Sequence, residues 1–405
     1  MKARIVGLLA SVVLSGCQEK LTSPADCPTL CPGGQPQVYD EVFIATPGTD
    51  SSFSGYVQTH QATSLLISNG LQGFEERALI RFLARADSVS LRDTLRGYTI
   101  DSVAFSFMVA ARDTNLDGVD LLLYRIAPTF DSASSFADLT LAFVPGSLID
   151  TLHVPDTLNA GVVRTVFQGA DLNRVQIEAS DSGKMALGVR IASPTPTGIR
   201  LGASGGGNGA VFTTYVTLDV PDTGTARLRS LALGPAFNTY VSEVPQVPDT
   251  MQLAVGGAPS ARSLLRFSLP SRIRDSATIV RATLELTPVA PITGLPTDPA
   301  RLTARAVLAD VGAKSPVSSG VGIGGQLPPP TDTLDIGATS VNLEAVRLVE
   351  LWLGATTRPS ALVLSLAPEA ASFTRPVFFS TRAADPAVRP RLRLSYLLSF
   401  PFETP

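Results

Sequence analysis

"RALIRF", residues 77–82, returns almost unchanged as "RSLLRF", residues 262–267. Four of the six positions are identical, and the other two hold residues of similar character. Upstream of each stretch a second match keeps the same order, because "FSGYV" from Phe53 corresponds to "FNTYV" from Phe237. The two matches are offset by 185 and 184 residues, which indicates that this chain contains two copies of one domain.

The matched segments predict where the two copies begin and end. We place the first copy at residues 37–221 and the second at 229–399, joined by a linker at 222–228 and followed by a tail at 400–405. A chain of 405 residues is long enough for more than one domain. Each copy is therefore expected to fold as a unit of its own.

Within each copy the apolar residues alternate with polar or smaller ones. In the first copy Val103, Phe105 and Phe107 share one face, and in the second "RPRLRLSY" sets Leu392 and Tyr396 opposite a row of arginines. A period of two is typical of half-buried antiparallel strands. Many such strands between glycine and proline turns predict an all-β fold of two tandem, jelly-roll-like β-sandwiches.

One stretch departs from this period. "SVNLEAVRLVELWLG", residues 340–354, has apolar residues at helical spacing, with Ser340 or Asn342 as a cap. We predict a single short helix there, with Trp352 in the core rather than exposed as a platform for a sugar. "ADLNRVQIEA" from Ala170 is a weaker counterpart in the first copy.

The second copy carries an ordered series of motifs that includes "LAVGG", "RSLLRFSLP", "SATIVRATLELTP" and "FFSTRAADPAVRPRLRLSY". In this order it resembles the DNRLRE domain of secreted bacterial proteins, which is related to disaggregatase-type repeats and to a family of carbohydrate-binding modules. The resemblance implies a β-sandwich with glycan binding, but it assigns no ligand-binding residue in either copy. The sequence departs from the family pattern at Arg382, where a glutamate is usual.

The start of the chain has the layout of a secretory signal. Lys2 and Arg4 precede an apolar run from residue 5 to residue 14, and small residues follow. The run is too short to cross a bilayer as a helix, which takes about 20 residues. We therefore expect export of the protein, with residues 1–16 as the signal peptide.

The end of this signal is "LSGC", which closes on Cys17. It resembles the lipobox of bacterial lipoproteins, and this implies that Cys17 becomes the acylated N-terminus. The alternative is a signal that contains a cysteine by chance. By the sorting logic of enterobacterial lipoproteins, Gln18 at the next position implies delivery to the outer membrane. The expected location is the bacterial cell envelope, with the lipid as the membrane contact.

Residues 17–36 form a tether rich in proline and glycine. It holds Cys27 and Cys31, which in an oxidising compartment could form a small local disulfide. We favour this disulfide over two free thiols. A metal site is disfavoured, because two thiols with no nearby histidine do not complete a tetrahedral set of ligands.

"DTNLDGVD" is the strongest local candidate for a metal site. Asp113, Asn115 and Asp117 alternate before a glycine, as in the first half of a calcium loop, and Asp120 follows. The second half does not match, since Tyr124 stands where that loop has its bidentate glutamate. The alternative is an ordinary polar hairpin, because Asn, Asp and Gly also favour turns. Apart from this calcium site, no cofactor is expected.

The remaining composition favours a binding protein over an enzyme. The two histidines, His60 and His153, have no nucleophile motif beside them. A formal charge of −3 offers nothing that attracts nucleic acid. We expect non-catalytic binding of a glycan or another envelope or extracellular polymer. The alternative is a structural scaffold whose sandwiches act as spacers or contact an envelope protein.

Replacing Cys17 with serine should abolish lipid modification and leave an unprocessed precursor. The reason is that the thiol is the only acceptor the lipobox offers. Metabolic labelling with a fatty-acid analogue measures this, with Cys27→Ser as the matched control. Labelling that persists in the Cys17→Ser protein would refute the anchor.

Overall fold

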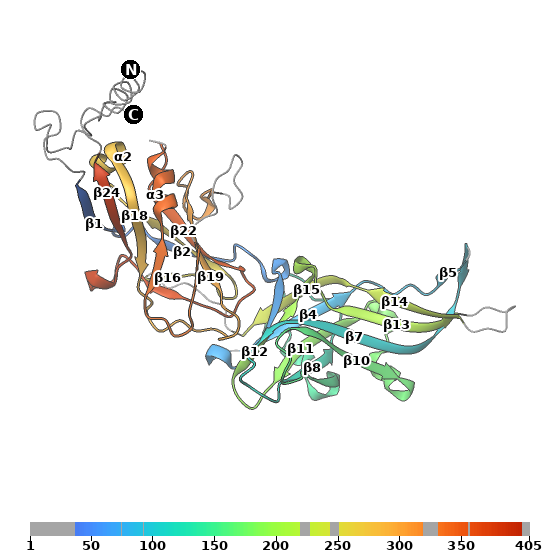
Figure 1. The fold of residues 1–405 in the computed structure, drawn as a ribbon. Helices are drawn as coiled ribbons and strands as arrows, with labels where there is room; N and C mark the ends of the chain where they lie inside the picture. The colour runs from blue at the N-terminus through green and yellow to red at the C-terminus, as the bar shows by residue number, and fades with distance from the viewer. Residues whose placement is uncertain are drawn as a thin grey trace, which may run out of the picture.

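The computed structural model of the chain consists of antiparallel sheets with few, short helices, which confirms the all-β fold class (Figure 1). The predicted lipidation site and disulfide, at Cys17, Cys27 and Cys31, lie outside the residues that the structure describes. The described residues are 37–73, 75–91, 93–218, 227–243, 251–318, 331–354 and 357–398.

The first group of strands forms a body that we call sandwich one, residues 59–242. Its strands are β3 (Ser64–Asn69), β4 (Glu76–Phe82), β7 (Tyr98–Arg112), β8 (Asp120–Arg125), β9 (Leu148–His153), β10 (Gly161–Gln168), β11 (Ala186–Ala192), β12 (Thr197–Gly202), β13 (Val211–Leu218), β14 (Arg227–Leu233) and β15 (Pro235–Ser242), with a small hairpin of β5 (Val89–Leu91) and β6 (Thr94–Arg96). One layer has the order β14-β13-β7-β10 and the other β15-β4-β11-β8-β9. The β12 and β3 strands connect the layers, so that the whole is one curved sheet.

The second group forms sandwich two, residues 38–54 together with 252–398. Its elements are β1 (Val38–Ile44), β2 (Ser51–Ser54), β16 (Gln252–Ala254), β17 (Ala261–Arg266), α2 (Ser271–Ser276), β18 (Ala277–Leu286), β19 (Arg301–Ala306), β20 (Thr331–Thr333), β21 (Val341–Glu344), α3 (Val346–Leu353), β22 (Ala361–Ala367), β23 (Val377–Phe379) and β24 (Arg391–Leu398). One layer has the order β1-β24-β18-β21 and the other β2-β17-β22-β19-β20, with β16 and β23 as a separate pair.

The two sandwiches have the same strand order. The β14-β13-β7-β10 layer corresponds to β1-β24-β18-β21, and β15-β4-β11-β8-β9 corresponds to β2-β17-β22-β19-β20. The opening sequence match lies at equivalent places, because "RALIRF" supplies β4 and "RSLLRF" supplies β17. The duplicated sequence therefore builds a duplicated topology.

The strand pairing crosses the predicted boundaries between the copies. The first two strands of the chain, β1 and β2, pair with β24 and β17 of sandwich two. The first two strands of the second copy, β14 and β15, pair with β13 and β4 of sandwich one. Each sandwich is thus completed by two strands of the other copy, and the divisions at 37–221 and 229–399 do not follow the sheets. Sequence similarity shows which strands are equivalent. It does not show which sandwich each strand joins, because the two sandwiches have equivalent sheets with equivalent edges.

A buried carboxylate fixes the β1–β2 segment in sandwich two. Asp50, in the loop between these strands, is only 2 % exposed. It accepts hydrogen bonds from the Thr381 amide at 2.8 Å and the Thr381 hydroxyl at 2.7 Å, and it pairs with Arg382 at 3.2 Å. Arg382 is therefore paired with a carboxylate from the exchanged segment.

The arginines of the repeated motif hold loops on the outer face of each sandwich. Arg81 on β4 donates hydrogen bonds to the Pro128 and Phe130 carbonyls at 2.9 and 3.1 Å. The equivalent Arg266 on β17 pairs with Asp310 at 2.5 Å. Alternate residues of the motif therefore face opposite sides of the strand. The apolar residues point toward the core, and the guanidinium groups contact the covering loop.

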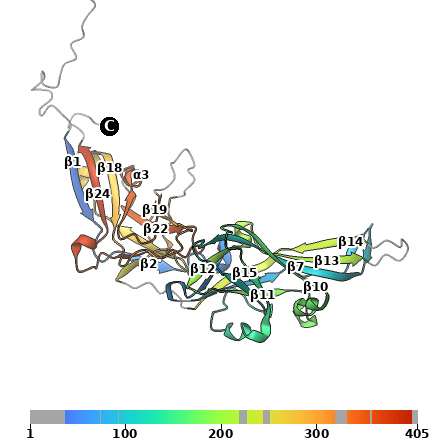
Figure 2. The same cartoon turned by 60° about the horizontal axis from the view of Figure 1, so that its bottom comes forward.

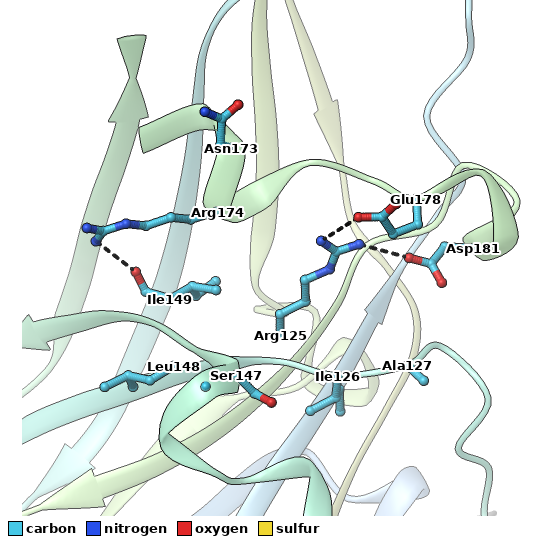
Figure 3. A pocket seen from close by; sticks show the side chains of 11 residues that line it. Arg125, Ile126, Ala127, Ser147, Leu148, Ile149, Asn173, Arg174, Glu178 and Asp181 are labelled. Atoms are coloured by element: carbon cyan, nitrogen blue, oxygen red, sulfur yellow. Dashed lines mark hydrogen bonds and ion pairs between the residues drawn. The ribbon is translucent and has the colours of Figure 1, made fainter. Parts of the chain in front are cut away.

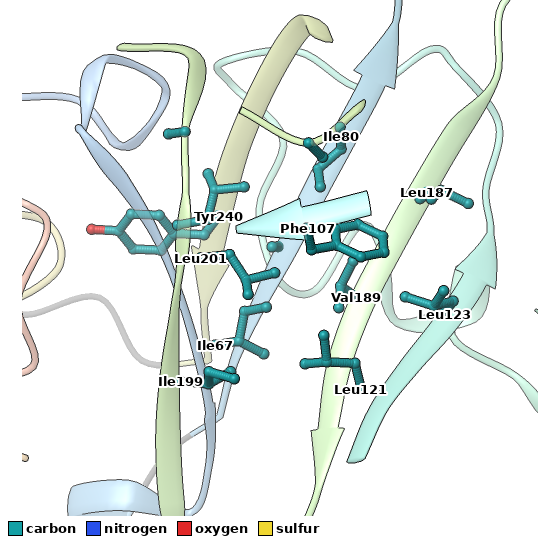
Figure 4. Close-up of a cluster of buried hydrophobic side chains, with 14 of the residues drawn as sticks. Ile67, Ile80, Phe107, Leu121, Leu123, Leu187, Val189, Ile199, Leu201 and Tyr240 are labelled. Atoms are coloured by element: carbon teal, nitrogen blue, oxygen red, sulfur yellow. The ribbon is translucent and has the colours of Figure 1, made fainter. Parts of the chain in front are cut away.

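The apolar positions predicted from alternation are buried. Val103, Phe105, Phe107 and Val109 on β7 are each at most 2 % exposed. In Figure 4 side chains from several strands, Phe107 among them, point into one cluster in sandwich one. Trp352 is 1 % exposed and donates its indole N–H to the Ala361 carbonyl at 3.1 Å, which confirms its expected place in the core.

The helix predicted at 340–354 is shorter than its sequence pattern suggests. Residues 341–344 form β21, which pairs with β18, and α3 begins only at Val346. The N-cap is Ala345 rather than Ser340 or Asn342, and Glu344 before it accepts the Val346 amide at 2.9 Å. Pairing with a neighbouring strand overrides the local helical spacing.

The other helical segments are short. The counterpart in the first copy is a 3-10 helix, η6 (Gly169–Val175), and α2 was not predicted. Among the described residues, none of the helices has the length and apolar character needed to cross a membrane.

Buried polar contacts connect the two sandwiches at the junction where they meet. Glu76 of sandwich one pairs with Arg375 of sandwich two at 2.6 Å, and both side chains are almost fully buried. Burial raises the pKa of Glu76, although the Arg375 guanidinium opposes the shift. Beside them Tyr240 donates its hydroxyl to the Ala370 carbonyl at 2.7 Å, and Phe373 packs in the core of sandwich one. The junction is therefore a packed interface and not a flexible hinge.

The exchange predicts how fragments behave. Residues 57–243 contain every strand of sandwich one and should fold alone, with a cooperative thermal transition. Residues 251–398 contain neither β1 and β2 nor their equivalents β14 and β15, so the edges of β24 and β17 are left unpaired and the fragment should aggregate or stay unfolded. Circular dichroism and thermal melting measure both outcomes.

A peptide of residues 37–54 should restore the cooperative melt of the 251–398 fragment, because it adds the missing strands in trans. A peptide with the same residues in scrambled order is the control. If the 251–398 fragment folded unaided, β1 and β2 would not be needed to complete sandwich two.

Candidate functional site

A polar pocket of about 460 Å³ lies at one edge of sandwich one (Figure 3). It forms where the end of β8 and the start of β9 face η6 and a second 3-10 turn, η7 (Ala179–Asp181). Its volume falls within the range of ligand pockets, about 300–1,000 Å³. The lining residues are Arg125, Ile126, Ala127, Gly146, Ser147, Leu148, Ile149, Asn173, Arg174, Glu178 and Asp181.

Arg125 organises one side of this pocket. It ends β8, and its guanidinium reaches Glu178 at 3.3 Å and Asp181 at 3.2 Å. In Figure 3 these two carboxylates stand side by side above Arg125. The Glu178 side chain is 63 % exposed and the Asp181 side chain 19 %, so the two acids differ in their access to solvent.

The opposite side is set by η6. Arg174 points away from Arg125 and donates to the Ile149 carbonyl at 3.5 Å (Figure 3). Asp171, one turn earlier, lies 3.6 Å from Arg174. Asn173 adds an amide with both donor and acceptor atoms.

This arrangement places hydrogen-bond donors and acceptors close together. Guanidinium and amide N–H groups alternate with carboxylate and hydroxyl oxygens, while Leu148 and Ile149 supply an aliphatic wall. Such a surface suits a ligand rich in hydroxyl groups, which donate and accept in turn. The lining includes no histidine or cysteine, and both carboxylates are bound to Arg125. These groups can recognise a ligand through hydrogen bonds.

Sandwich two also has a cavity. The second cavity, about 340 Å³, lies there between α2 and α3, against Leu269, Ser271, Arg274, Asp275, Trp352 and Leu353. Its walls come from other elements than those of the first pocket. The two cavities therefore lie at different places in the strand arrangement that the sandwiches share.

Sequence reasoning missed the pocket because its charged residues are far apart in the chain. Arg125 and Asp181 are 56 residues apart, and they meet only through the curvature of the sheet and the placement of η7. Neither belongs to a motif of fixed spacing. The weak helical match at "ADLNRVQIEA" was the one local signal, since it marks η6.

The predicted calcium loop is organised by an arginine. Arg112, at the end of β7, is 1 % exposed and donates to the Asp113 carbonyl at 3.3 Å, the Pro155 carbonyl at 3.0 Å and the Leu116 carbonyl. Its guanidinium thereby holds the loop through backbone carbonyls. The sequence pattern did not include Arg112, because it precedes the loop.

The four predicted calcium ligands do not converge in the structure. The Asp113 carboxylate accepts the Asn115 amide at 2.9 Å, as in a local turn, and Asp120 pairs with His153 at 2.9 Å. Across the described ranges, no group of three or more His, Cys, Asp or Glu residues is placed to hold a metal ion, and this includes Asp117. The loop forms a local polar turn between β7 and β8, but it is not the hairpin of the alternative interpretation, because these two strands lie in different layers and pair with other strands.

The two histidines occupy separate places. His153 belongs to the surface ion pair with Asp120, and His60 stacks on Phe237 with ring centroids 5.7 Å apart. Neither lines the pocket.

Comparison with known proteins gives little guidance. No family model matches the chain, and no curated protein matches it. Among solved structures, one similar chain is the M60 catalytic domain with two CBM51 domains of ZmpB from Clostridium perfringens. The identity is 7 % and the TM-score 0.14, over 88 % of this chain and 39 % of that one. This protein therefore spans well under half of the solved chain.

Proposed function

We propose that this protein is a lipid-anchored component of the bacterial cell envelope, attached to the outer membrane, whose sandwich one binds a glycan or another extracellular polymer without altering it. The observation that carries the proposal is the position of the pocket relative to the start of β1. Val38 pairs with Leu397 at the end of sandwich two that faces away from sandwich one (Figures 1 and 2).

A lipid on Cys17 would therefore hold sandwich two next to the membrane. Sandwich one would project outward, because the buried pair of Glu76 and Arg375 fixes the junction between the sandwiches. The pocket would then lie on the part of the molecule farthest from the anchor. A polymer outside the membrane could reach it.

The chemistry of the pocket supports a glycan as the ligand. Arg125, Asn173, Ser147 and Glu178 offer hydrogen-bond donors and acceptors over a space that fits small sugar units. The pocket lining has no aromatic ring, so stacking adds nothing to affinity there. We expect weak binding in the micromolar to millimolar range, about −8 to −4 kcal/mol.

A scaffold role is the second candidate. The observation that favours it is the packed junction, because a fixed angle between two sandwiches suits a spacer that contacts an envelope protein. The experiment below separates the two roles.

The purified mature chain should bind one or more polysaccharides of a broad glycan panel and leave them at their original length. Arg125→Gln should weaken this binding about tenfold, the effect of losing roughly 1.4 kcal/mol, because the substitution frees both carboxylates from their partner. Arg347→Gln, an exposed residue paired with Glu350 on α3, is the matched control and should bind like wild type.

Calorimetry measures the affinity, and size-exclusion chromatography follows the length of the polymer. Shortened polymer would identify an enzyme. If no glycan of the panel bound and a specific envelope protein co-purified, the scaffold role would be established instead.

A further inference from the structure

The β1-β24-β18-β21 layer and the equivalent β14-β13-β7-β10 layer differ in charge on their outer faces. The difference lies in one row of residues that are neighbours across adjacent strands. In sandwich two the row across β24, β18 and β21 is Arg391, Glu285 and Asn342. The equivalent row across β13, β7 and β10 of sandwich one is Val211, Ser106 and Arg164. The acid at the centre of the first row is thus a serine in the second.

In sandwich two the central acid, Glu285, pairs with two arginines. Glu285 accepts hydrogen bonds from Arg391 at 2.6 Å and from Arg393 at 2.8 Å. Partial burial would raise the pKa of Glu285, but the hydrogen bonds and charges of Arg393 and Arg391 outweigh it and hold the pKa below its usual value. Both of these arginines therefore have an acidic partner.

In sandwich one the equivalent face leaves its cation without an acid. Arg164 extends over the small side chains of β7 and donates to the Tyr215 hydroxyl at 2.8 Å, with its guanidinium carbon 5.7 Å from the Tyr215 ring centre. Within the part of the chain that the structure describes, Arg164 forms no salt bridge. Asp101, an acid of the same strand as Ser106, is five positions away and accepts the Thr217 hydroxyl.

We propose that a carboxylate of a uronic-acid polysaccharide binds Arg164 at the place that Glu285 fills in sandwich two. A guanidinium binds a carboxylate with two parallel hydrogen bonds, and only one N–H of Arg164 is engaged by Tyr215. Ser106 leaves room for this group and adds a hydroxyl. The Tyr215 ring, held in place by Arg164, offers an apolar surface to the sugar ring. The inference rests on the proposed function and names the class of glycan.

Polygalacturonate and its methyl-esterified form provide the test, because they share a backbone and differ in charge. The full mature chain should bind the acid form about tenfold more tightly at low salt, and the preference should fall as salt screens the exposed pair. Arg164→Gln should remove the preference. Arg229→Gln, which removes an exposed cation from the neighbouring β14, is the matched control and should retain it.

Ser106→Glu is the sharper variant, because it restores in sandwich one the acid that sandwich two already has. The new carboxylate should pair with Arg164 and abolish the preference without lowering the melting temperature. Thr278→Glu, which adds the same charge to the exposed face of sandwich two, should leave the preference intact.

The possible failures are distinguishable. Absence of binding to polygalacturonate, equal binding of both polymers, or a preference that survives both Arg164→Gln and Ser106→Glu would overturn the carboxylate site. Binding of neutral glycans that depends on Arg125 would still support the proposed function. Loss of all glycan binding in wild type would overturn the proposed function as well.

Discussion

The exchange of edge strands between the two copies is the constraint on which the rest of the structure depends. Without β14 and β1, the β13 and β24 strands would expose unpaired N–H and C=O groups, which other chains could extend. Because each copy covers the edges of the other, neither is complete alone. The segment that follows the tether is consequently locked into the C-terminal half of the chain, and Asp50 reinforces this closure from inside.

The packed junction holds the two sandwiches in a fixed arrangement. Removing either member of the Glu76–Arg375 pair would strand a buried charge, which typically costs about 3–5 kcal/mol. With the junction fixed, the chain enters at the far end of sandwich two, and the surfaces of sandwich one stay at a set distance from that point. The two copies differ on such surfaces, for example where sandwich one has Ser106 and sandwich two has Glu285.

Sequence alone predicted the features that depend on local pattern. Alternation identified the buried side of β7, and the apolar surroundings of Trp352 placed it in the core. It did not predict which sheet each edge strand joins, because equivalent sheets present equivalent edges. It also missed the start of α3, where strand pairing prevails, and the role of Arg112, which satisfies loop oxygens from outside the motif. The pocket around Arg125 escaped notice since its charges meet only in the folded chain.

Disulfide trapping tests the exchange most directly, in a chain whose three native cysteines are replaced. Asp40 faces Ser395 across β1 and β24, and Ser230 faces Tyr215 across β14 and β13. Paired cysteines at either of these sites should form a disulfide within one monomer. The crossed pairs, 40 with 215 and 230 with 395, would meet only if each copy kept its own strands. Efficient intramolecular bonding of the crossed pairs, with none at the facing pairs, would contradict the exchanged fold.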